Sequence, residues 1–138
     1  MDETDRKILN LLKKNARASY SEIAQQVSLT SPAVKERIIK MEDTGIIEKY
    51  TINIDYQKMG KRITAFIMFE TVNCKAFREF CSKQPMVLKY YRIAGYYSYL
   101  VKVVAEDMEL LEAFIDETMR FGTPSTHIVF SSAVNDSI

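Results

Sequence analysis

The sequence predicts an α+β fold in two parts: a winged helix-turn-helix domain of three helices at residues 1–60 and a ferredoxin-like βαββαβ domain at residues 61–138. Two observations lead to this prediction. Apolar residues recur at helical spacing as far as Gly45, and beyond it they alternate with polar residues as in a strand. The second half then shows strand, helix, two strands, helix and strand in that order, which is typical of an antiparallel sheet with both helices on one face.

Size and composition indicate a packed intracellular protein. The chain has 138 residues, and 47% of them are apolar, which is enough for a hydrophobic core. No apolar run approaches the ~18 residues of a membrane span, and the N-terminus MDETDRK lacks the apolar segment of a signal peptide. We therefore expect a cytoplasmic protein with no membrane partner.

The helix-turn-helix prediction comes from residues 19–40, which follow a first helix that begins after Asp2. Ser19 and Glu22 have the spacing of a capping box. Ser31 is expected to cap the third helix, with Pro32 at its first position, where no amide is needed. The buried stripe of that helix is expected at Val34, Ile38 and Met41. An ordinary helical bundle is the alternative interpretation of the same pattern.

The segment after Gly45 is expected to be extended. Tyr50, Ile52 and Ile54 alternate with polar residues, which predicts a half-buried strand. Residues 46–47 are expected to pair with it as a short wing, and residues 55–61 provide the linker between the two domains.

The second domain has a clear order of elements. Pro85 and the turn at 94–98 separate its patterns. The expected strands cover residues 63–71, 87–93, 99–105 and 126–134, and the expected helices cover residues 74–84 and 108–121.

The central strands of this sheet predict a partner. Residues 66–69 and 100–104 hardly alternate between apolar and polar, so both faces of the sheet are expected to be buried. Two helices cover only one face, and the other is expected to pack on a second copy of the chain. The alternative cover is a helix of the first domain, folded back over the linker.

The sequence suggests no catalytic or metal centre. Cys74 and Cys81 lie two turns apart on one helix face, too far apart for a disulfide, and are expected to be reduced thiols. His127 is the only histidine, so neither a nucleophile–base pair nor a set of metal ligands is indicated. We expect no cofactor and no enzymatic activity.

The whole chain resembles the Lrp/AsnC regulators of bacteria and archaea, also called feast/famine regulators. In the first domain the resemblance is carried by Asp5, Ile8, Leu9, Leu12, Arg17, Ser19, Glu22, Ile23, Ala24, Leu29, Val34, Arg37, Ile38, Met41, Glu42, Gly45, Ile46 and Ile47. In the second domain it is carried by Ile93, Ala94, Gly95, Tyr97, Tyr99 and Leu100, around a glycine turn.

The resemblance implies a transcriptional regulator that binds double-stranded DNA with its third helix in the major groove. The groove-facing candidates lie off the buried stripe, at Ser31, Pro32, Lys35, Glu36, Ile39 and Lys40. Arg37 borders the stripe and is expected either to clamp Glu42 or to bind a phosphate. Further phosphate contacts are expected at Ser19, Tyr20, Ser21 and Lys49, the first three at a helix N-terminus.

The resemblance also implies homodimers that associate to tetramers or octamers, and an amino-acid effector bound in the second domain. The candidate effector turn contains Gly95, Tyr96, Tyr97, Ser98 and Tyr99. The family commonly has aspartates just after the glycine, whereas this chain has Tyr96 and Ser98. An amino-acid ligand would lose a counter-charge for its ammonium group there, so the resemblance supports DNA binding better than it supports an effector.

Charge limits how such a protein can act. The net charge is only +1, so a single copy would bind phosphate weakly and DNA binding would require several copies. The leading hypothesis is therefore a sequence-preferring regulator that acts on the nucleoid as a homo-oligomer. The alternatives are an architectural protein that bends or wraps DNA, a free-standing amino-acid sensor and, less well supported, a small enzyme.

Overall fold

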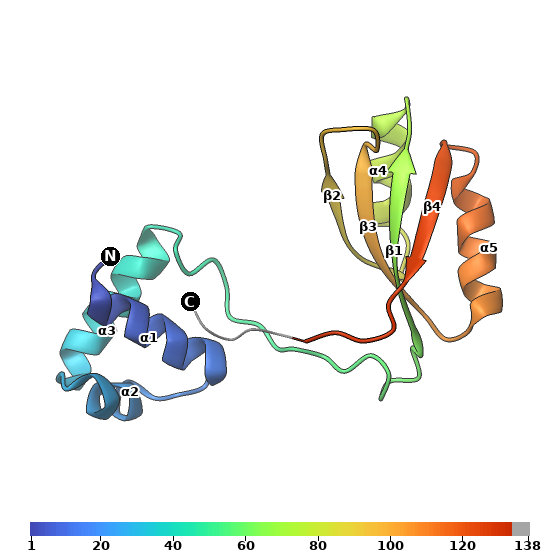
Figure 1. Ribbon diagram of the computed structural model, residues 1–138. Coiled ribbons are helices and arrows are strands. Elements are labelled where there is room, and N and C mark those ends of the chain that lie inside the picture. The colour runs from blue at the N-terminus through green and yellow to red at the C-terminus, as the bar shows by residue number, and fades with distance from the viewer. Residues whose placement is uncertain (134–138) are drawn as a thin grey trace. The chain divides into compact units, whose positions relative to one another are not determined.

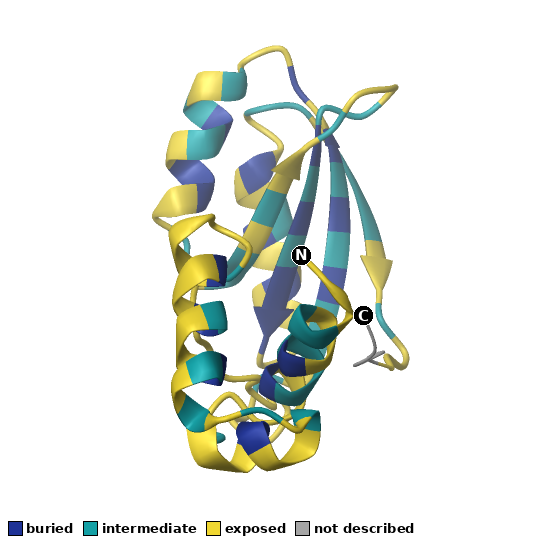
Figure 2. Ribbon diagram, turned by 90° about the vertical axis from the view of Figure 1, so that its left-hand side faces the viewer, coloured by how far each residue is buried: buried dark blue, intermediate teal, exposed yellow. Residues whose placement is uncertain are grey.

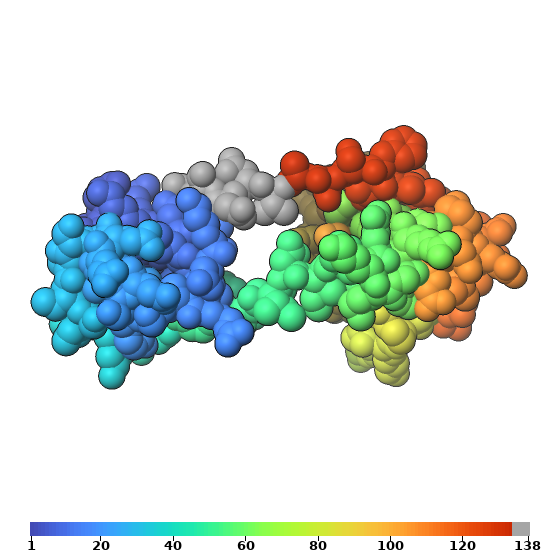
Figure 3. All heavy atoms as spheres, turned by 90° about the horizontal axis from the view of Figure 1, so that it is seen from below, coloured from blue at the N-terminus to red at the C-terminus, as the bar shows by residue number. Residues whose placement is uncertain are grey.

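The computed structural model describes residues 1–133. The chain forms two compact units, one containing Met1–Asn53 and the other Ile54–Ser132, which we call the N-terminal and C-terminal domains. Each is close-packed in itself (Figure 3) and has its own hydrophobic core.

Three helices build the N-terminal domain: α1 (Glu3–Lys14), α2 (Tyr20–Val27) and α3 (Ser31–Asp43) (Figure 1). Each helix turns one apolar stripe toward a shared core. The stripe predicted for the third helix is confirmed, because Val34, Ile38 and Met41 are at most 3% exposed. Ile8 of α1 and Ile23 of α2 complete the fully buried centre.

Side-chain caps determine where these helices begin. Asp2 caps α1, and the predicted capping box of α2 is confirmed: the Glu22 amide donates to Ser19 Oγ at 3.2 Å, and the Ser19 amide donates to Glu22 Oε2 at 2.6 Å. The prediction that Ser31 caps α3 is wrong. Thr30 is the extended residue before that helix, and its Oγ1 accepts the Ala33 amide at 3.4 Å. A proline one residue further into the first turn still needs no amide.

The predictions of a strand and a wing after α3 are also wrong. Residues 46–55 contain no strand, and Ile52 is 79% exposed rather than half-buried. A strand is stable only where its backbone groups pair with a neighbouring strand, and nothing in residues 1–133 pairs with this segment. The alternation therefore belongs to an extended, exposed segment.

The C-terminal domain has the predicted βαββαβ order. Its elements are β1 (Ile63–Glu70), α4 (Cys74–Ser82), β2 (Val87–Arg92), β3 (Tyr99–Ala105), α5 (Met108–Thr118) and β4 (Thr123–Ile128). The four strands form one antiparallel sheet in the order β2-β3-β1-β4.

The bounds of the last helix and strand differ from the predicted ones. The helix ends at Thr118 rather than residue 121, and β4 begins at Thr123 rather than residue 126. Pro124, a residue type that usually follows the end of a helix, lies within β4, an edge strand, where a missing amide is tolerated. The strand ends at Ile128, so the prediction of a strand over residues 129–133 is wrong, and Val134, its predicted end, lies outside the described residues.

One face of the sheet forms the core of this domain together with α4 and α5. Buried residues of β1 and β3 pack there against phenylalanines of the helices. The Phe69 and Phe77 rings stack with centroids 4.3 Å apart, and Phe77 lies 5.0 Å from the ring of Tyr99.

The opposite sheet face is not covered by the helices of this domain. Buried and half-buried bands alternate along the central strands (Figure 2). In β1, the half-buried residues from Thr64 onward are Thr64, Phe66 and Met68. Leu100 and Lys102 of β3 are half-buried on the same face, directly opposite Met68 and Phe66. The expected burial of both faces is thus incomplete in the described single chain.

Candidate functional site

The outer face of α3 is the main candidate site. The buried stripe holds one side of this helix against α1 and α2, so the other side faces outward. Pro32, Lys35, Glu36, Ile39 and Lys40 are all exposed there, and Ser31 is half-exposed at the first turn. Ile39 is an apolar side chain that is 40% exposed among charged neighbours. This mixture of cations, one acid and apolar groups is suited to the edges of bases as well as to phosphates.

Arg37 joins α3 to the beginning of α1. Its Nη1 donates to Asp2 Oδ2 and to Asp5 Oδ1, both at 2.7 Å. The predicted pairing with Glu42 is wrong, because Arg37 meets these two aspartates instead. The two hydrogen bonds raise the pKa of the Arg37 guanidinium. Arg37 therefore positions the third helix in this structure.

The two aspartates also form the capping box of α1. The Asp5 amide donates to Asp2 Oδ1 at 2.9 Å, and the Asp2 amide donates to Asp5 Oδ2 at 2.8 Å. The hydrogen bond from the Asp5 amide, and next the one from Arg37, lower the pKa of Asp2. One cluster thus starts α1 and also holds α3.

The N-terminus of α2 offers backbone donors. Ser19 is already used, since its hydroxyl and amide both belong to the capping box. The amides of Tyr20 and Ser21 lie in the first turn, where a helix provides no acceptors for them. Tyr20 is 41% exposed at the same position.

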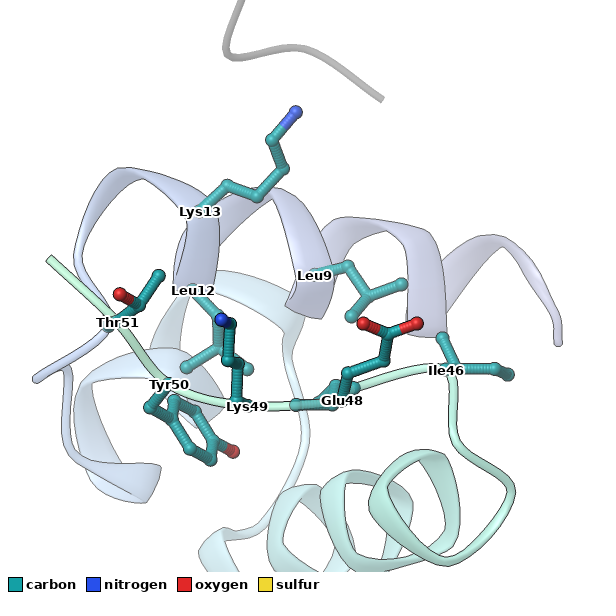
Figure 4. A pocket seen from close by; sticks show the side chains of 10 residues that line it. Leu9, Leu12, Lys13, Ile46, Glu48, Lys49, Tyr50 and Thr51 are labelled. Atoms are coloured by element: carbon teal, nitrogen blue, oxygen red, sulfur yellow. The ribbon is translucent and has the colours of Figure 1, made fainter. Parts of the chain in front are cut away.

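The exit segment after α3 lines a groove against α1 (Figure 4). The groove holds about 490 Å³, with Leu9 and Leu12 on the α1 side and residues 46–51 on the other. The Tyr50 hydroxyl donates to Glu42 Oε1 at 2.7 Å, and partial burial followed by this bond raises the pKa of Tyr50 to about 12. That bond anchors the exit segment to α3, while Lys49 beside it is exposed.

The candidate effector turn connects β2 to β3. The Ser98 amide donates to the Phe69 carbonyl oxygen at 2.8 Å, and Ser98 Oγ donates to the Thr71 carbonyl oxygen at 3.2 Å. Gly95 has a φ of 128°, which favours glycine there. The turn is thereby attached to the end of β1.

The tyrosines of this turn have different environments. Tyr96 is 76% exposed and lies edge-on to the Tyr97 ring, with centroids 5.0 Å apart. Tyr99 is fully buried, and its hydroxyl accepts a hydrogen bond from Arg78 Nη1 at 2.9 Å. Tyr99 therefore supports the turn from within the core.

Neither a metal site nor a membrane-spanning helix is found in residues 1–133. No three His, Cys, Asp or Glu side chains gather closely enough to hold an ion in that part of the chain. None of its helices combines the length and apolarity needed to cross a bilayer. His127 lies 3.2 Å from Ser125 Oγ on an exposed edge strand.

Two family models match the chain, one for each domain. Residues 1–42 match the AsnC-type helix-turn-helix domain, and residues 64–138 match the Lrp/AsnC ligand binding domain. The chain belongs to the Lrp/AsnC family. It is a transcriptional regulator with a helix-turn-helix DNA-binding domain and a ligand-binding domain.

Similar proteins support this Lrp/AsnC assignment over nearly the full length. YezC, an uncharacterised HTH-type transcriptional regulator of Bacillus subtilis, is 44% identical over 133 residues, which cover 96% of each chain. The structure of Bacillus subtilis LrpC is 32% identical, covers 97% of each chain and superimposes with a TM-score of 0.92. A regulator of Neisseria meningitidis solved as a complex with L-Met has the same fold, with 24% identity, 98% of this chain and 93% of that one covered, and a TM-score of 0.88.

The sequence of this Lrp/AsnC chain does not reveal the interactions of two of its carboxylates, Asp2 and Glu70. Asp2 was recognised as a cap, but its pairing with Arg37 spans 35 positions and has no local signal. Glu70 carries no local signal of a role, yet a hydrogen bond to its carboxylate raises the pKa of Tyr96 in the candidate effector turn. The antiparallel pairing of β1 with β3 brings the end of β1, and with it Glu70, beside the turn. A predicted pairing of these two strands was therefore the signal that could have linked Glu70 to the turn.

Proposed function

We propose that this regulator binds DNA in a sequence-preferring way, with α3 in the major groove. The observation that carries the proposal is the outer face of α3, polar and exposed opposite a fully buried stripe. The groove-facing residues would be Ser31, Pro32, Lys35, Glu36, Ile39 and Lys40. Outward-facing residues of a recognition helix in the major groove reach base edges and phosphates in helix-turn-helix complexes.

Phosphate contacts would flank that helix. The amides at Tyr20 and Ser21, with the hydroxyl of Ser21 beside them, suit a phosphate oxygen at the positive end of α2, whereas Ser19 stays in its capping box. Lys49 would reach a second phosphate from the exit segment. Arg37 would remain paired with Asp2 and Asp5 and would orient α3 rather than contact DNA.

We assign the uncovered sheet face to a homodimer. Phe66, Met68 and Leu100 are half-buried apolar residues on this face, and the Lys102 ammonium lies 5.9 Å from the Phe66 ring centroid. Packing sheet on sheet would remove this surface from water. Dimers would associate further to tetramers or octamers, which adds DNA-binding units to a chain with a net charge of +1. Such a regulator would act in the cytoplasm, on the nucleoid, without catalytic activity.

An amino acid is the effector class that we propose for the C-terminal domain. This domain matches a ligand-binding model, and the Neisseria protein of the same fold was solved with L-Met. Glu70 beside Tyr96 would supply the carboxylate that the turn itself lacks. Calorimetric titration with the common amino acids tests this assignment. If none of them gives a heat of binding, the assignment of an amino-acid effector is wrong.

The DNA proposal is tested by replacing both Lys35 and Lys40 with alanine. We expect weaker binding to any duplex and a plot of log affinity against log salt that is flatter by about two, because two phosphate-neutralising charges are lost. Fluorescence anisotropy at several salt concentrations measures both quantities.

The matched control for that experiment removes two exposed lysines from the C-terminal domain, Lys75 and Lys83. This variant has the same net charge as the double variant in α3. Equal affinities and salt slopes for the two double variants would contradict the assignment of α3 to the DNA.

A further inference from the structure

Glu36 lies at the centre of the outer face of α3. It follows the buried Val34 by two positions, which is a rotation of about 200° around a helix, so its side chain points almost directly away from the core. Pro32 and Lys40 are one turn away on either side of it, and both are exposed. Any duplex that α3 enters would therefore meet this carboxylate first.

No group in residues 1–133 holds the Glu36 carboxylate. It takes part in no hydrogen bond or ion pair, although Lys40 lies four positions along the helix, at the spacing that favours pairing. Several other acids of this domain do have structural partners. Glu22 belongs to a capping box and Glu42 accepts the Tyr50 hydroxyl, whereas the Glu36 carboxylate remains available to a ligand.

A carboxylate in the major groove is stabilised only by a hydrogen-bond donor, because the phosphates repel it and most base-edge groups are acceptors. The donors there are the amino groups of cytosine and adenine. Adenine places its N7 acceptor next to the amino group, which repels an anion. Cytosine has no such acceptor beside its N4, so it is the base that a carboxylate accepts from most favourably.

We propose that Glu36 is a specificity-determining residue that reads a cytosine in each half-site, by accepting a hydrogen bond from the N4 amino group. This inference rests on the proposed DNA-binding function and adds a base preference to it. Lys35 and Lys40 offset the repulsion between the carboxylate and nearby phosphates. Glu36 would thus contribute selectivity, while the lysines contribute affinity.

The experiment selects binding sites from randomised duplexes with the full-length wild-type protein and with Glu36→Gln and Glu36→Ala. The wild type should select a C·G pair at one position of each half-site and lose about ten-fold in affinity when that pair is replaced. Glu36→Ala should lose the preference at that position alone. Glu36→Gln should shift it toward adenine, because a glutamine amide can pair with both N6 and N7.

Asp43→Asn is the matched control. It removes one negative charge from the same helix, but from an exposed residue at its C-terminal end, away from the residues that reach bases. We expect it to bind all duplexes slightly more tightly and to select the same base pairs as the wild type. Circular dichroism of each variant checks that the helix content of the protein is unchanged.

The outcomes separate the inference from the function on which it rests. If all four proteins select the same base pairs, the role of Glu36 is overturned while DNA binding by α3 stands. If the wild type binds duplexes without selecting any sequence, the cytosine contact is overturned and the architectural alternative is favoured. If the wild type binds no duplex at all, both the function and the inference fail.

Discussion

Arg37 is the residue that holds α3, and with it the proposed DNA-binding face, against the start of α1. It lies on α3, but its two partners, Asp2 and Asp5, lie at the start of α1 at 2.7 Å each. Those aspartates cap α1 as well, so one cluster fixes the beginning of α1 relative to the middle of α3. An exposed ion pair alone contributes little, whereas a cation shared by two capping carboxylates has a defined geometry.

This cluster predicts a pH-dependent effect of Arg37→Gln. The pKa of Asp2 and of Asp5 is lowered from the ordinary 3.8, so their interactions stabilise the folded state above about pH 4. That stability is lost as the pH falls through the lowered values. At neutral pH we expect Arg37→Gln to lower Tm by a few degrees, and the difference from wild type should disappear in strong acid. Thermal unfolding followed by circular dichroism measures it.

Arg17→Gln is the control for this prediction. Arg17 is exposed, and among the described residues its side chain has no ion-pair partner. Its variant should unfold at the wild-type temperature at every pH. Equal Tm values for the two variants at neutral pH would show that the Arg37 cluster does not stabilise the domain.

At the scale of elements, local patterns were sufficient for the helices. Capping residues and apolar spacing located α1, α2 and the buried stripe of α3, because helix hydrogen bonds and caps are made between near neighbours. The order of the C-terminal strands and helices could likewise be predicted from the spacing of apolar residues within each segment.

Elements that depend on distant partners were not predictable in the same way. The segment 50–54 has strand-like alternation but no pairing partner in the described chain. Pro124 signals a stop in isolation, yet it is compatible with an edge strand once β1 lies on its other side. The pairing of Arg37 with Asp2 likewise needed the tertiary structure. In the candidate site, the exposed face of α3 was thus predictable, but the group that orients it was not.

The uncovered face of the sheet predicts the effect of a charge at Leu100. Leu100 lies opposite Met68, at the half-buried centre of that face, so Leu100→Glu would place carboxylates within the proposed dimer contact. We expect a monomer of 15.9 kDa that still folds, because the side chain faces away from the core of its own domain. Sedimentation velocity and circular dichroism test the two parts of this expectation.

Val72→Glu is the matched control for the sheet variant. Val72 is a fully exposed apolar residue outside the strands, so the same change of charge should leave the assembly unchanged. A wild-type protein that sediments as a monomer, or a Leu100→Glu protein that keeps the wild-type mass, would refute the role of this face.

At the scale of the whole molecule, the proposed DNA binding and the proposed assembly depend on each other. A chain with a net charge of +1 presents only a few cations on α3, and affinity for DNA follows the number of phosphates neutralised. Joining two copies makes the second contact intramolecular and raises the overall affinity by orders of magnitude.

The most direct test of this account is the mass of the complex formed on a selected duplex, measured by sedimentation for the wild type and for Leu100→Glu. The account predicts an even number of wild-type chains per duplex. For the variant it predicts a loss of affinity for the duplex of about a hundred-fold or more. A single chain bound per duplex, with the variant binding as tightly as the wild type, would contradict it.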